Sequence, residues 1–312
     1  MTEQLDLQSI RIVRAIADSG SITSAARMLG YSQPAVSQHL QRAEIRLGVP
    51  LVSRVGRSVR LTEAGQVLAR HARVISSALD AAAGDLADLA GLRAGTVRLA
   101  AFPTASSTIV PRLLALVSEQ HPGIRVTYVE AQPPQAVSML RDGSIDLAVT
   151  FNYPGDRADP HRDSANGLET QTLYTEEMVA VLPADHPLAA EPVINVAALD
   201  GERWIAGCPR CRGHLLAVCE VAGFEPAIAF ETDNASAVLN MVASGLGVAM
   251  LPRLALATAS MPAGAVIRQH APESMRSIHL VASDGAERVP SIAAAIAVLQ
   301  RMPGTEWGLT QA

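Results

Sequence analysis

The fold of the N-terminal part of the chain is decided by residues 21–51, which read SITSAARMLGYSQPAVSQHLQRAEIRLGVPL. Gly30 ends a first short helix, because glycine readily adopts the left-handed conformation of a helix end. Ser32 is predicted to cap a second helix with Pro34 in its first turn, where a missing N–H does no harm. Gly48 ends this second helix. Its apolar residues recur at steps of four, three and four and therefore share one face: Val36, Leu40, Ala43 and Leu47.

The opposite face of the second helix offers short amides and hydroxyls instead of solubilising charge: Gln33, Ser37, Gln38 and Gln41. Gln and Ser side chains bond base edges in the major groove of DNA. Arginines follow that can contact phosphates around such a helix: Arg42, Arg54, Arg57 and Arg60. The pattern indicates either a DNA-reading helix-turn-helix or a small three-helix module that binds protein.

The flanking residues complete a small helical domain. An apolar face predicts a preceding helix that Gly20 ends; its members are Leu7, Ile10, Val13, Ile16 and Ala17. Ser21 or Thr23 then caps the first helix of the pair. Residues 51–61 form two short β-like runs around Gly56, which predicts a hairpin.

A long helix is predicted next. Thr62 begins a Thr-Glu-Ala-Gly run, and no proline interrupts the chain from there to about Leu89. Apolar residues recur every seven positions at Leu68, Ile75, Ala82 and Leu89, flanked by Leu79 and Leu86. A long helix with one apolar seam and no sheet beside it favours pairing with another helix. The alternative is that the seam packs on the helix's own domain.

These N-terminal residues resemble the signature of LysR-type transcriptional regulators. The matching positions are Ala25, Ala26, Leu29, the run 32–37, Leu40, Glu44, Leu47, Gly48, Leu51, Arg54 and the run 60–65. Residues 245–252, GLGVAMLP, resemble a recurrent segment of the family's C-terminal half. Val52 and Ser53 depart from the family, which commonly has an aromatic and an acidic residue there, and this bears on hairpin packing only.

The resemblance implies an N-terminal all-α winged helix-turn-helix with a long linker helix, followed by a two-lobed α/β effector-binding domain that resembles periplasmic solute-binding proteins. We expect the DNA-binding domain at 1–61, the linker and dimerisation helix at 62–90, and the effector-binding domain at 95–312. Lobe I is expected at about 95–165 and 268–302, and lobe II at about 168–265.

The resemblance also implies residue roles and partners. Gln33, Pro34, Ser37 and Gln38 should read bases, and Ser32, Arg54 and Arg57 should contact the DNA backbone. The expected partners are double-stranded promoter DNA and further copies of the chain. These copies would form a homodimer, and a homotetramer when the C-terminal halves also pair. RNA polymerase stays open as a further partner.

The C-terminal half alternates between strand and helix, which predicts an open, mainly parallel sheet. A hinge-like break at 91–95 precedes it, and a polar loop at 152–167 interrupts it. The first strands are expected at 97–102, 126–130 and 145–151, with helices at 109–119 and 134–141 between them. Further strands are expected at 178–182, 204–206, 228–231, 247–251 and 278–283, and a last helix at 291–301.

Composition excludes several classes of protein. Apolar residues make up 49% of the 312 residues and charged residues only 18%, which argues against disorder. No uncharged apolar stretch is long enough to span a membrane, and the first residues lack a secretory signal, so we expect the cytoplasm and no membrane partner. Residues 1–62 carry eight arginines and four acids, whereas the remainder carries 17 basic and 26 acidic residues. A basic end on an acidic body indicates a polyanion partner at that end.

The effector site is expected where open α/β sheets bind ligands, beyond the carboxyl ends of strands. The candidate effector-binding residues at these ends are Thr104, Ser106, Phe151, Asn152, Cys208, Arg210, Thr232 and Asp233, with Ser107 and Asn234 beside them. Converging helix starts with free N–H groups predict an anionic metabolite, with Arg210 pairing with a carboxylate. Asp233 argues against an anion. Ordinary helix capping would leave the same residues in place.

A Cys-x-x-Cys pair stands out. Cys208 and Cys211 are followed by His214 and Cys219. The group fits three descriptions: unreactive structure, a redox pair, or zinc ligands. Three cysteines in such a chain do not make a disulfide scaffold.

No Ser/His/Asp or paired-carboxylate constellation stands out, so we expect no catalysis, no bound metal and no cofactor besides the effector. The predicted function is a DNA-binding transcriptional regulator modulated by a small molecule between two lobes. The alternative from another class is a solute-binding protein or thiol-redox enzyme whose N-terminal helices bind protein. A solute-binding protein of this kind needs an export signal, which is missing.

Overall fold

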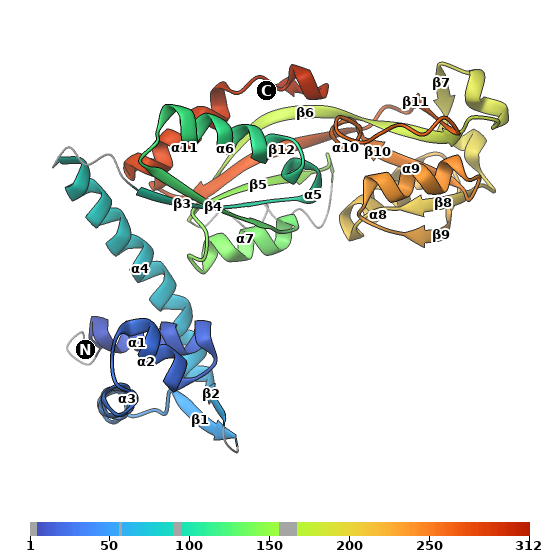
Figure 1. The fold of residues 1–312 in the computed structure, drawn as a ribbon. Helices are drawn as coiled ribbons and strands as arrows, with labels where there is room; N and C mark the ends of the chain where they lie inside the picture. Colours follow the sequence, from blue (N-terminus) through green and yellow to red (C-terminus); the bar gives the residue numbers. More distant parts are fainter. Residues whose placement is uncertain (1–4, 56–57, 90–94, 156–166) are drawn as a thin grey trace. The chain divides into compact units, whose positions relative to one another are not determined.

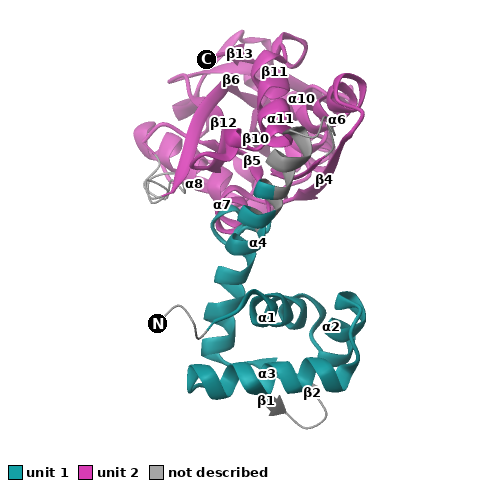
Figure 2. Cartoon of the chain, turned by 90° about the vertical axis from the view of Figure 1, so that its left-hand side faces the viewer, with its two compact units in different colours: residues 1–92, 139–144 teal, residues 93–138, 145–312 magenta. Residues whose placement is uncertain are grey.

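A computed structural model describes residues 5–55, 58–89, 95–155 and 167–312. Residues 91–94 of the break predicted at 91–95, residues 56–57 of the predicted hairpin, which include Arg57, and residues 156–166 of the loop predicted at 152–167 lie outside the described residues. The chain forms two compact units, residues 1–92 with 139–144 and residues 93–138 with 145–312 (Figure 2).

The first unit begins with three helices whose ends follow the predicted signals: α1 (Leu7–Ser19), α2 (Ile22–Leu29) and α3 (Gln33–Leu47). Gly20, Gly30 and Gly48 follow them with φ of 70°, 72° and 71°, the left-handed region that favours glycine. The Ser21 side chain accepts the backbone N–H of Ser24, and that of Ser32 accepts the N–H of Ala35. Ser21 is therefore the cap of α2, one of the two residues predicted for it.

A β-hairpin follows α3 and is tied to it by one carboxylate. Strands β1 (Val52–Val55) and β2 (Ser58–Leu61) pair antiparallel, with Val52 opposite Leu61. One Glu44 carboxylate oxygen accepts the backbone N–H groups of Leu51 and Val52 at 2.7 and 3.1 Å. The hairpin is thus anchored at its first residue by a side chain of α3.

Helix α4 (Glu63–Leu89) corrects part of the predicted seam. The Thr62 hydroxyl accepts the N–H of Gly65, which starts the helix as predicted. The buried residues of the first unit form one core that includes Leu68, Ala69 and Ala72 of α4, with Ile75 packed against it. The first three turns therefore pack on their own domain, the alternative weighed above. Apolar side chains that α4 leaves exposed include Val67, Val74 and Leu79.

The second unit is built on one continuous sheet path of order β4-β3-β5-β12-β6-β10-β8-β9 (Figure 1). In lobe I, β3 (Gly95–Ala101) pairs parallel with β4 (Ile124–Glu130) and β5 (Leu147–Asn152). Its helices are α5 (Pro103–Ser106), α6 (Ile109–Gln120), α7 (Pro133–Arg141) and α11 (Pro290–Arg301). This part agrees with the predicted parallel arrangement. The sheet as a whole is mixed and not mainly parallel, because β12 pairs antiparallel with β5 and β6, and β6 pairs antiparallel with β10.

Two long strands correct the expected lobe boundaries. Strand β6 (Leu168–Pro183) pairs with β12 (Met275–Ser283) from Leu168 to Glu177, in lobe I, and with β10 from Met178 onward. The boundary expected at 168 therefore falls inside β6, after Glu177. The last residues also belong to lobe I, because β13 (Thr310–Gln311) pairs with β6. Figure 1 shows β6 running through both lobes as one strand.

Lobe II completes the sheet. Strand β10 (Val248–Pro252) lies parallel to β8 (Arg203–Ala206), which lies parallel to β9 (Ala227–Glu231). Strand β11 (Ala265–Ala271) pairs with β6 and β7 (Val193–Asn195), so lobe II extends past 265 to about 271. The helices are α8 (Pro209–Val221), α9 (Ala235–Ala243) and α10 (Arg253–Leu256). Short 3₁₀ turns occupy Pro187–Ala190, Val196–Leu199, Ala286–Arg288 and Thr305–Trp307. Within the described ranges, none of the helices is both long and apolar enough to cross a bilayer.

Removing the Glu44 carboxylate should loosen the hairpin. Leu51 is buried, so Glu44→Ala leaves its N–H without an acceptor, at a cost of about 1–3 kcal/mol. Hydrogen exchange followed by mass spectrometry on peptides covering 49–61 should speed up roughly fivefold to a hundredfold. Glu44→Gln keeps one acceptor oxygen and should lose less protection. Unchanged exchange in Glu44→Ala would show that other contacts hold the hairpin.

Candidate DNA-reading face and effector cleft

Helix α3 separates its apolar and polar residues as predicted. Val36, Leu40 and Ala43 are buried in the core of the first unit. The exposed residues on the other side are Ser32, Gln33, Pro34, Gln38, Gln41 and Arg42, with Ser37 half-buried among them. The Gln33 amide donates to the Ser37 hydroxyl at 2.9 Å. Of the remaining candidates, Arg60 is exposed, the side chain of Arg54 lies outside the described residues, and so does Arg57.

A polar cluster that the sequence did not reveal fixes α3 against the start of α1. The Asp6 carboxylate pairs with Arg46 and with His39, and His39 also lies 3.2 Å from the Ser9 hydroxyl. Burial would raise the pKa of Asp6, but hydrogen bonds from the Ser9 backbone and from Arg46 outweigh it and hold that pKa well below its usual value. Asp6 and Ser9 lie 30 to 40 positions before His39 and Arg46, so no local sequence pattern indicates the cluster.

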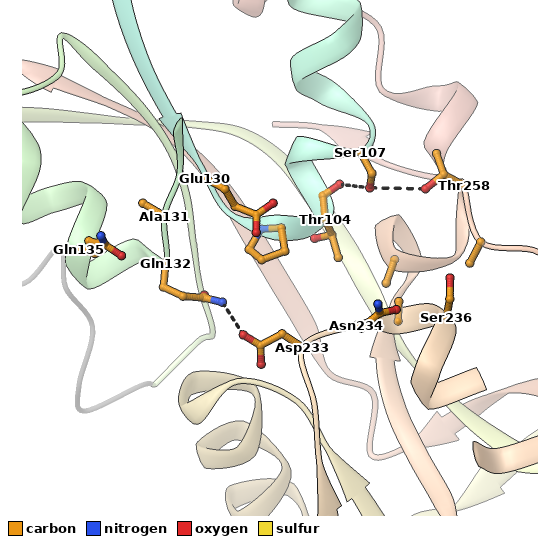
Figure 3. Close-up of a pocket in the computed structure, with 14 residues that line it drawn as sticks. Thr104, Ser107, Glu130, Ala131, Gln132, Gln135, Asp233, Asn234, Ser236 and Thr258 are labelled. Atoms are coloured by element: carbon orange, nitrogen blue, oxygen red, sulfur yellow. Dashed lines mark hydrogen bonds between the residues drawn. The ribbon is translucent and has the colours of Figure 1, made fainter. Parts of the chain in front are cut away.

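The second unit contains an open cleft between its lobes, with a cavity of about 590 Å³ (Figure 3). Lobe I contributes the carboxyl ends of β3 and β4 with the residues after them: Pro103, Thr104, Ser107, Glu130, Ala131, Gln132 and Gln135. Lobe II contributes the start of α9 and the residues around α10: Asp233, Asn234, Ala235, Ser236, Ala255, Thr258 and Ala259. Two hydrogen bonds cross the cleft, from the Gln132 amide to Asp233 at 3.1 Å and from Thr258 to Ser107 at 3.4 Å.

A smaller cavity of about 50 Å³ shares Thr104, Gln132 and Asp233 with the larger one. Its other polar side chains are Cys208, Cys211, Thr232 and Arg276, and its apolar lining includes Phe102 and Phe151. A water molecule occupies about 30 Å³ in the liquid, so this space admits only the smallest molecules.

The Arg276 guanidinium, which lines this cavity, already bonds to protein side chains. It bonds one oxygen of Glu176 through Nε at 2.8 Å and Nη2 at 2.6 Å, and Nη2 also donates to the Thr104 hydroxyl at 3.2 Å. Its Cζ lies 5.0 Å and 4.6 Å from the ring centroids of Phe102 and Phe151. Burial would lower the pKa of Arg276, but the Glu176 carboxylate outweighs it and raises that pKa.

Cys208 and Cys211 lie side by side at the start of α8. The Cys208 thiol donates to the Cys211 sulfur, with 3.1 Å between the two Sγ atoms, and the Tyr153 hydroxyl donates to Cys211 at 3.4 Å. These contacts, and the nearby charge of Arg276, outweigh burial and lower the pKa of Cys211 to about 6. The same thiol–thiolate hydrogen bond, together with burial, raises the pKa of Cys208. The two pKa values shift in opposite directions because Cys208 donates this hydrogen bond and Cys211 accepts it.

Five of the eight predicted effector residues line the two cavities: Thr104, Phe151, Cys208, Thr232 and Asp233. The other three do not. Ser106 donates to the Phe102 carbonyl and accepts from Tyr128, Asn152 pairs with His279 at 2.8 Å, and the Arg210 guanidinium lies over the Phe151 ring. Ser106 does not line either cavity because the single turn of α5 places Ser107 there instead. Asn152 does not because it lies at the end of β5, where it pairs with β12.

The residues that sequence reasoning missed fall into two groups. Glu130 and Gln132 follow β4 by the same strand-end rule that found Thr104, so the signal was present. Arg276 begins a strand near the end of the chain and reaches the site through tertiary structure, without a local signal. Zinc would need a group of at least three His, Cys, Asp or Glu side chains placed to hold a metal ion, and the described ranges contain none. His214 and Cys219 therefore do not complete a ligand set with Cys208 and Cys211 there.

Comparisons with known proteins match this organisation. Residues 7–66 match the model of the bacterial regulatory helix-turn-helix protein, lysR family, and residues 90–303 match that of the LysR substrate binding domain. A relative from Mycobacterium avium, described as a probable hydrogen peroxide-inducible genes activator, is 32% identical over 82% of this chain and 80% of its own.

Two solved structures are also similar. A full-length OxyR variant from Pseudomonas aeruginosa has a TM-score of 0.75 at 24% identity and covers 99% of this chain and 98% of its own. An OxyR mutant from Corynebacterium glutamicum with bound H₂O₂ has a TM-score of 0.59 at 25% identity over 95% and 92% of the two chains. The chain belongs to the LysR family, and is a DNA-binding transcriptional regulator with a domain for a small-molecule effector, not an enzyme.

Proposed function

We propose that the exposed polar face of α3 reads the bases of promoter DNA through Gln33, Ser37, Gln38 and Gln41. The burial of the opposite face supports this, because it turns these amides and hydroxyls away from the core and toward a major groove. Pro34 and Ser32 lie at the helix start beside them. Arg42, Arg54 and Arg57 contact phosphates and set the position of the helix.

The effector binds in the cleft of the second unit, and the observation that carries this is the cavity of about 590 Å³ lined by both lobes. A ligand that contacts Thr104 of lobe I and Asp233 of lobe II prefers one lobe arrangement over others, and only such a preference shifts an equilibrium. Phe151, Cys208 and Thr232 lie deeper, around the smaller cavity, and bind any part of the effector that reaches it. No further cofactor or metal is required.

The regulator acts as an assembly in the cytoplasm, where its promoter DNA is found. The apolar surface left on the first unit supports a dimer, because Leu7, Met28 and Leu79 are exposed around one groove. The dimer contact therefore uses Leu79 and not Leu68, which is buried in the core of its own domain. Pairing of the second units extends the dimer to a tetramer, and RNA polymerase is the further partner at the promoter.

A second candidate function is a response to small oxidants through Cys208 and Cys211. The 3.1 Å between their sulfurs favours it, as does the lowered pKa of Cys211. Two similar proteins point the same way: the probable hydrogen peroxide-inducible genes activator and the OxyR mutant with bound H₂O₂. The smaller cavity, which Cys208 and Cys211 line, has a volume of about 50 Å³ and can hold a molecule as small as hydrogen peroxide.

In this candidate function a hydroperoxide oxidises Cys208 and Cys211 to a disulfide in two steps. The Cys211 thiolate attacks one peroxide oxygen, so that an S–O bond forms, the O–O bond breaks, and the leaving oxygen takes up a proton. The Cys208 thiol then gives up its proton and attacks the Cys211 sulfur. An S–S bond forms, the S–O bond breaks, and water leaves.

Replacing a base-reading residue and replacing a phosphate-contacting residue should affect DNA binding differently. Gln38→Ala should weaken binding to the specific operator by about 1–3 kcal/mol and leave nonspecific binding unchanged. Arg42→Ala should weaken binding to every sequence and flatten the salt dependence by about one unit. Mobility shifts with the chain's own upstream DNA and with random DNA measure both. Equal losses on both DNAs in Gln38→Ala would contradict the assignment.

The effector assignment is tested by filling the cleft. Ser236 and Ser244 are both exposed and stand near opposite ends of α9, but only Ser236 lines the cavity. Metabolites that raise the melting temperature of the wild-type protein should lose this effect in Ser236→Trp and keep it in Ser244→Trp. DNA affinity without effector should be the same in both variants. If the same metabolites stabilise both variants equally, the effector binds elsewhere.

The oxidant candidate predicts an unusual pH profile for one thiol. Iodoacetamide alkylates thiolates, so the rate at Cys211 should rise through about pH 6, the pKa that the Cys208 hydrogen bond lowers. In Cys208→Ala the rise should move toward the ordinary thiol range. Cys219, with a pKa raised to about 11 by burial, is the internal control and should not react. A profile at Cys211 like that of a free thiol would remove the basis for this candidate.

A further inference from the structure

The charge of the cleft differs from what the sequence predicts. Among the described residues that line the larger cavity, the ionisable ones are Glu130 and Asp233, and neither is matched by a lining Arg, Lys or His. The nearest buried cation, Arg276, is neutralised by Glu176 at hydrogen-bond distance. An anion in this cleft would face two carboxylates, whereas a cation would be attracted by both.

The helix starts around the cleft offer few N–H donors. Helix α5 begins at Pro103 and α7 begins with Pro133 and Pro134, and proline has no backbone N–H. At α9 the Asn234 side chain accepts the N–H of Ala237, and at α8 the Cys208 sulfur accepts that of Cys211. Prolines and side-chain caps therefore remove some of the N–H groups that could hold an anion at these helix starts.

One acceptor in the cleft has no donor. The Gln132 amide donates through Nε2 to Asp233, whereas its Oε1 is buried and lacks a hydrogen-bond partner in the described part of the chain. Buried polar atoms are almost always paired, so an unpaired acceptor on a cavity wall points to a donor supplied by a ligand. Glu130, Gln132 and Asp233 all line the larger cavity, so two carboxylates and one amide face each other across this part of the cleft (Figure 3).

We propose that the cleft binds a small organic cation, an aliphatic amine or guanidine whose N–H groups donate to Glu130, Gln132 and Asp233. The side chains of Ala131, Ala235, Ala255 and Ala259 line the same cavity and suit a chain of methylene groups. A cavity of about 590 Å³ falls within the usual size of small-molecule sites, which is roughly 300–1,000 Å³. The proposal rests on the effector site proposed above and names its ligand class.

The test uses two four-carbon probes of opposite charge on the full-length protein, the diamine putrescine and the dicarboxylate succinate. Calorimetry at millimolar probe should show binding of putrescine and none of succinate. Glu130→Gln and Asp233→Asn should each weaken putrescine binding by about tenfold or more, since each removes a charged acceptor. Glu220→Gln, an exposed acid on α8 outside the cleft, removes the same charge and should change nothing.

Ser236→Trp separates failure of the ligand class from failure of the site. If succinate binds to the wild-type protein and Ser236→Trp abolishes that binding, the cleft is the site and the ligand class is wrong. If Ser236→Trp leaves putrescine binding intact, the site itself is wrong. Absence of putrescine binding at millimolar concentration, or an equal loss in Glu220→Gln, also overturns the proposal.

Discussion

The effector domain depends on one buried ion pair, Glu176 with Arg276, placed where the chain crosses between its lobes. The two residues face each other on β6 and β12 and are almost inaccessible to solvent. Glu176 also accepts the backbone N–H of Leu254 in lobe II, and Arg276 donates to Thr104 in lobe I. Removing one partner of such a pair typically costs about 3–5 kcal/mol, because the other charge stays buried alone. The pair therefore holds together the strands, α5 and α10 from which the cleft is built.

This pair also explains why the cleft is acceptor-rich. Arg276 is the one cation found beside the smaller cavity in the described structure, and Glu176 balances its charge before a ligand arrives. The remaining ionisable groups on the larger cavity are carboxylates, and prolines or side-chain caps occupy the helix starts. The anion expected from converging helix dipoles relied on free N–H groups, and these prolines and caps reduce their number. The dipoles persist, but hydrogen bonds and full charges at short range outweigh them.

In the first unit the long helix α4 completes the core of the DNA-binding domain. A domain of about 60 residues buries little surface by itself. It therefore takes Leu68, Ala69 and Ala72 of α4 into its core, and α1 packs along them. The heptad repeat of the sequence does not distinguish this packing from pairing with a second helix, since both need one apolar face. Leu79, further along the same helix, is exposed and is not part of that core.

The sequence by itself determined the features whose causes are local. Gly20, Gly30 and Gly48 end their helices, Ser21, Ser32 and Thr62 cap the next ones, and the apolar stripe of α3 orients its polar face. Strand ends located Thr104, Cys208 and Asp233 at the cleft, and the Cys-x-x-Cys spacing placed two sulfurs in contact. Only the tertiary structure decided where β6 crosses between the lobes, which residue of α5 faces the cleft, and that Arg276 reaches it. Those outcomes depend on pairing between residues about 100 positions apart, and no local pattern encodes such a pairing.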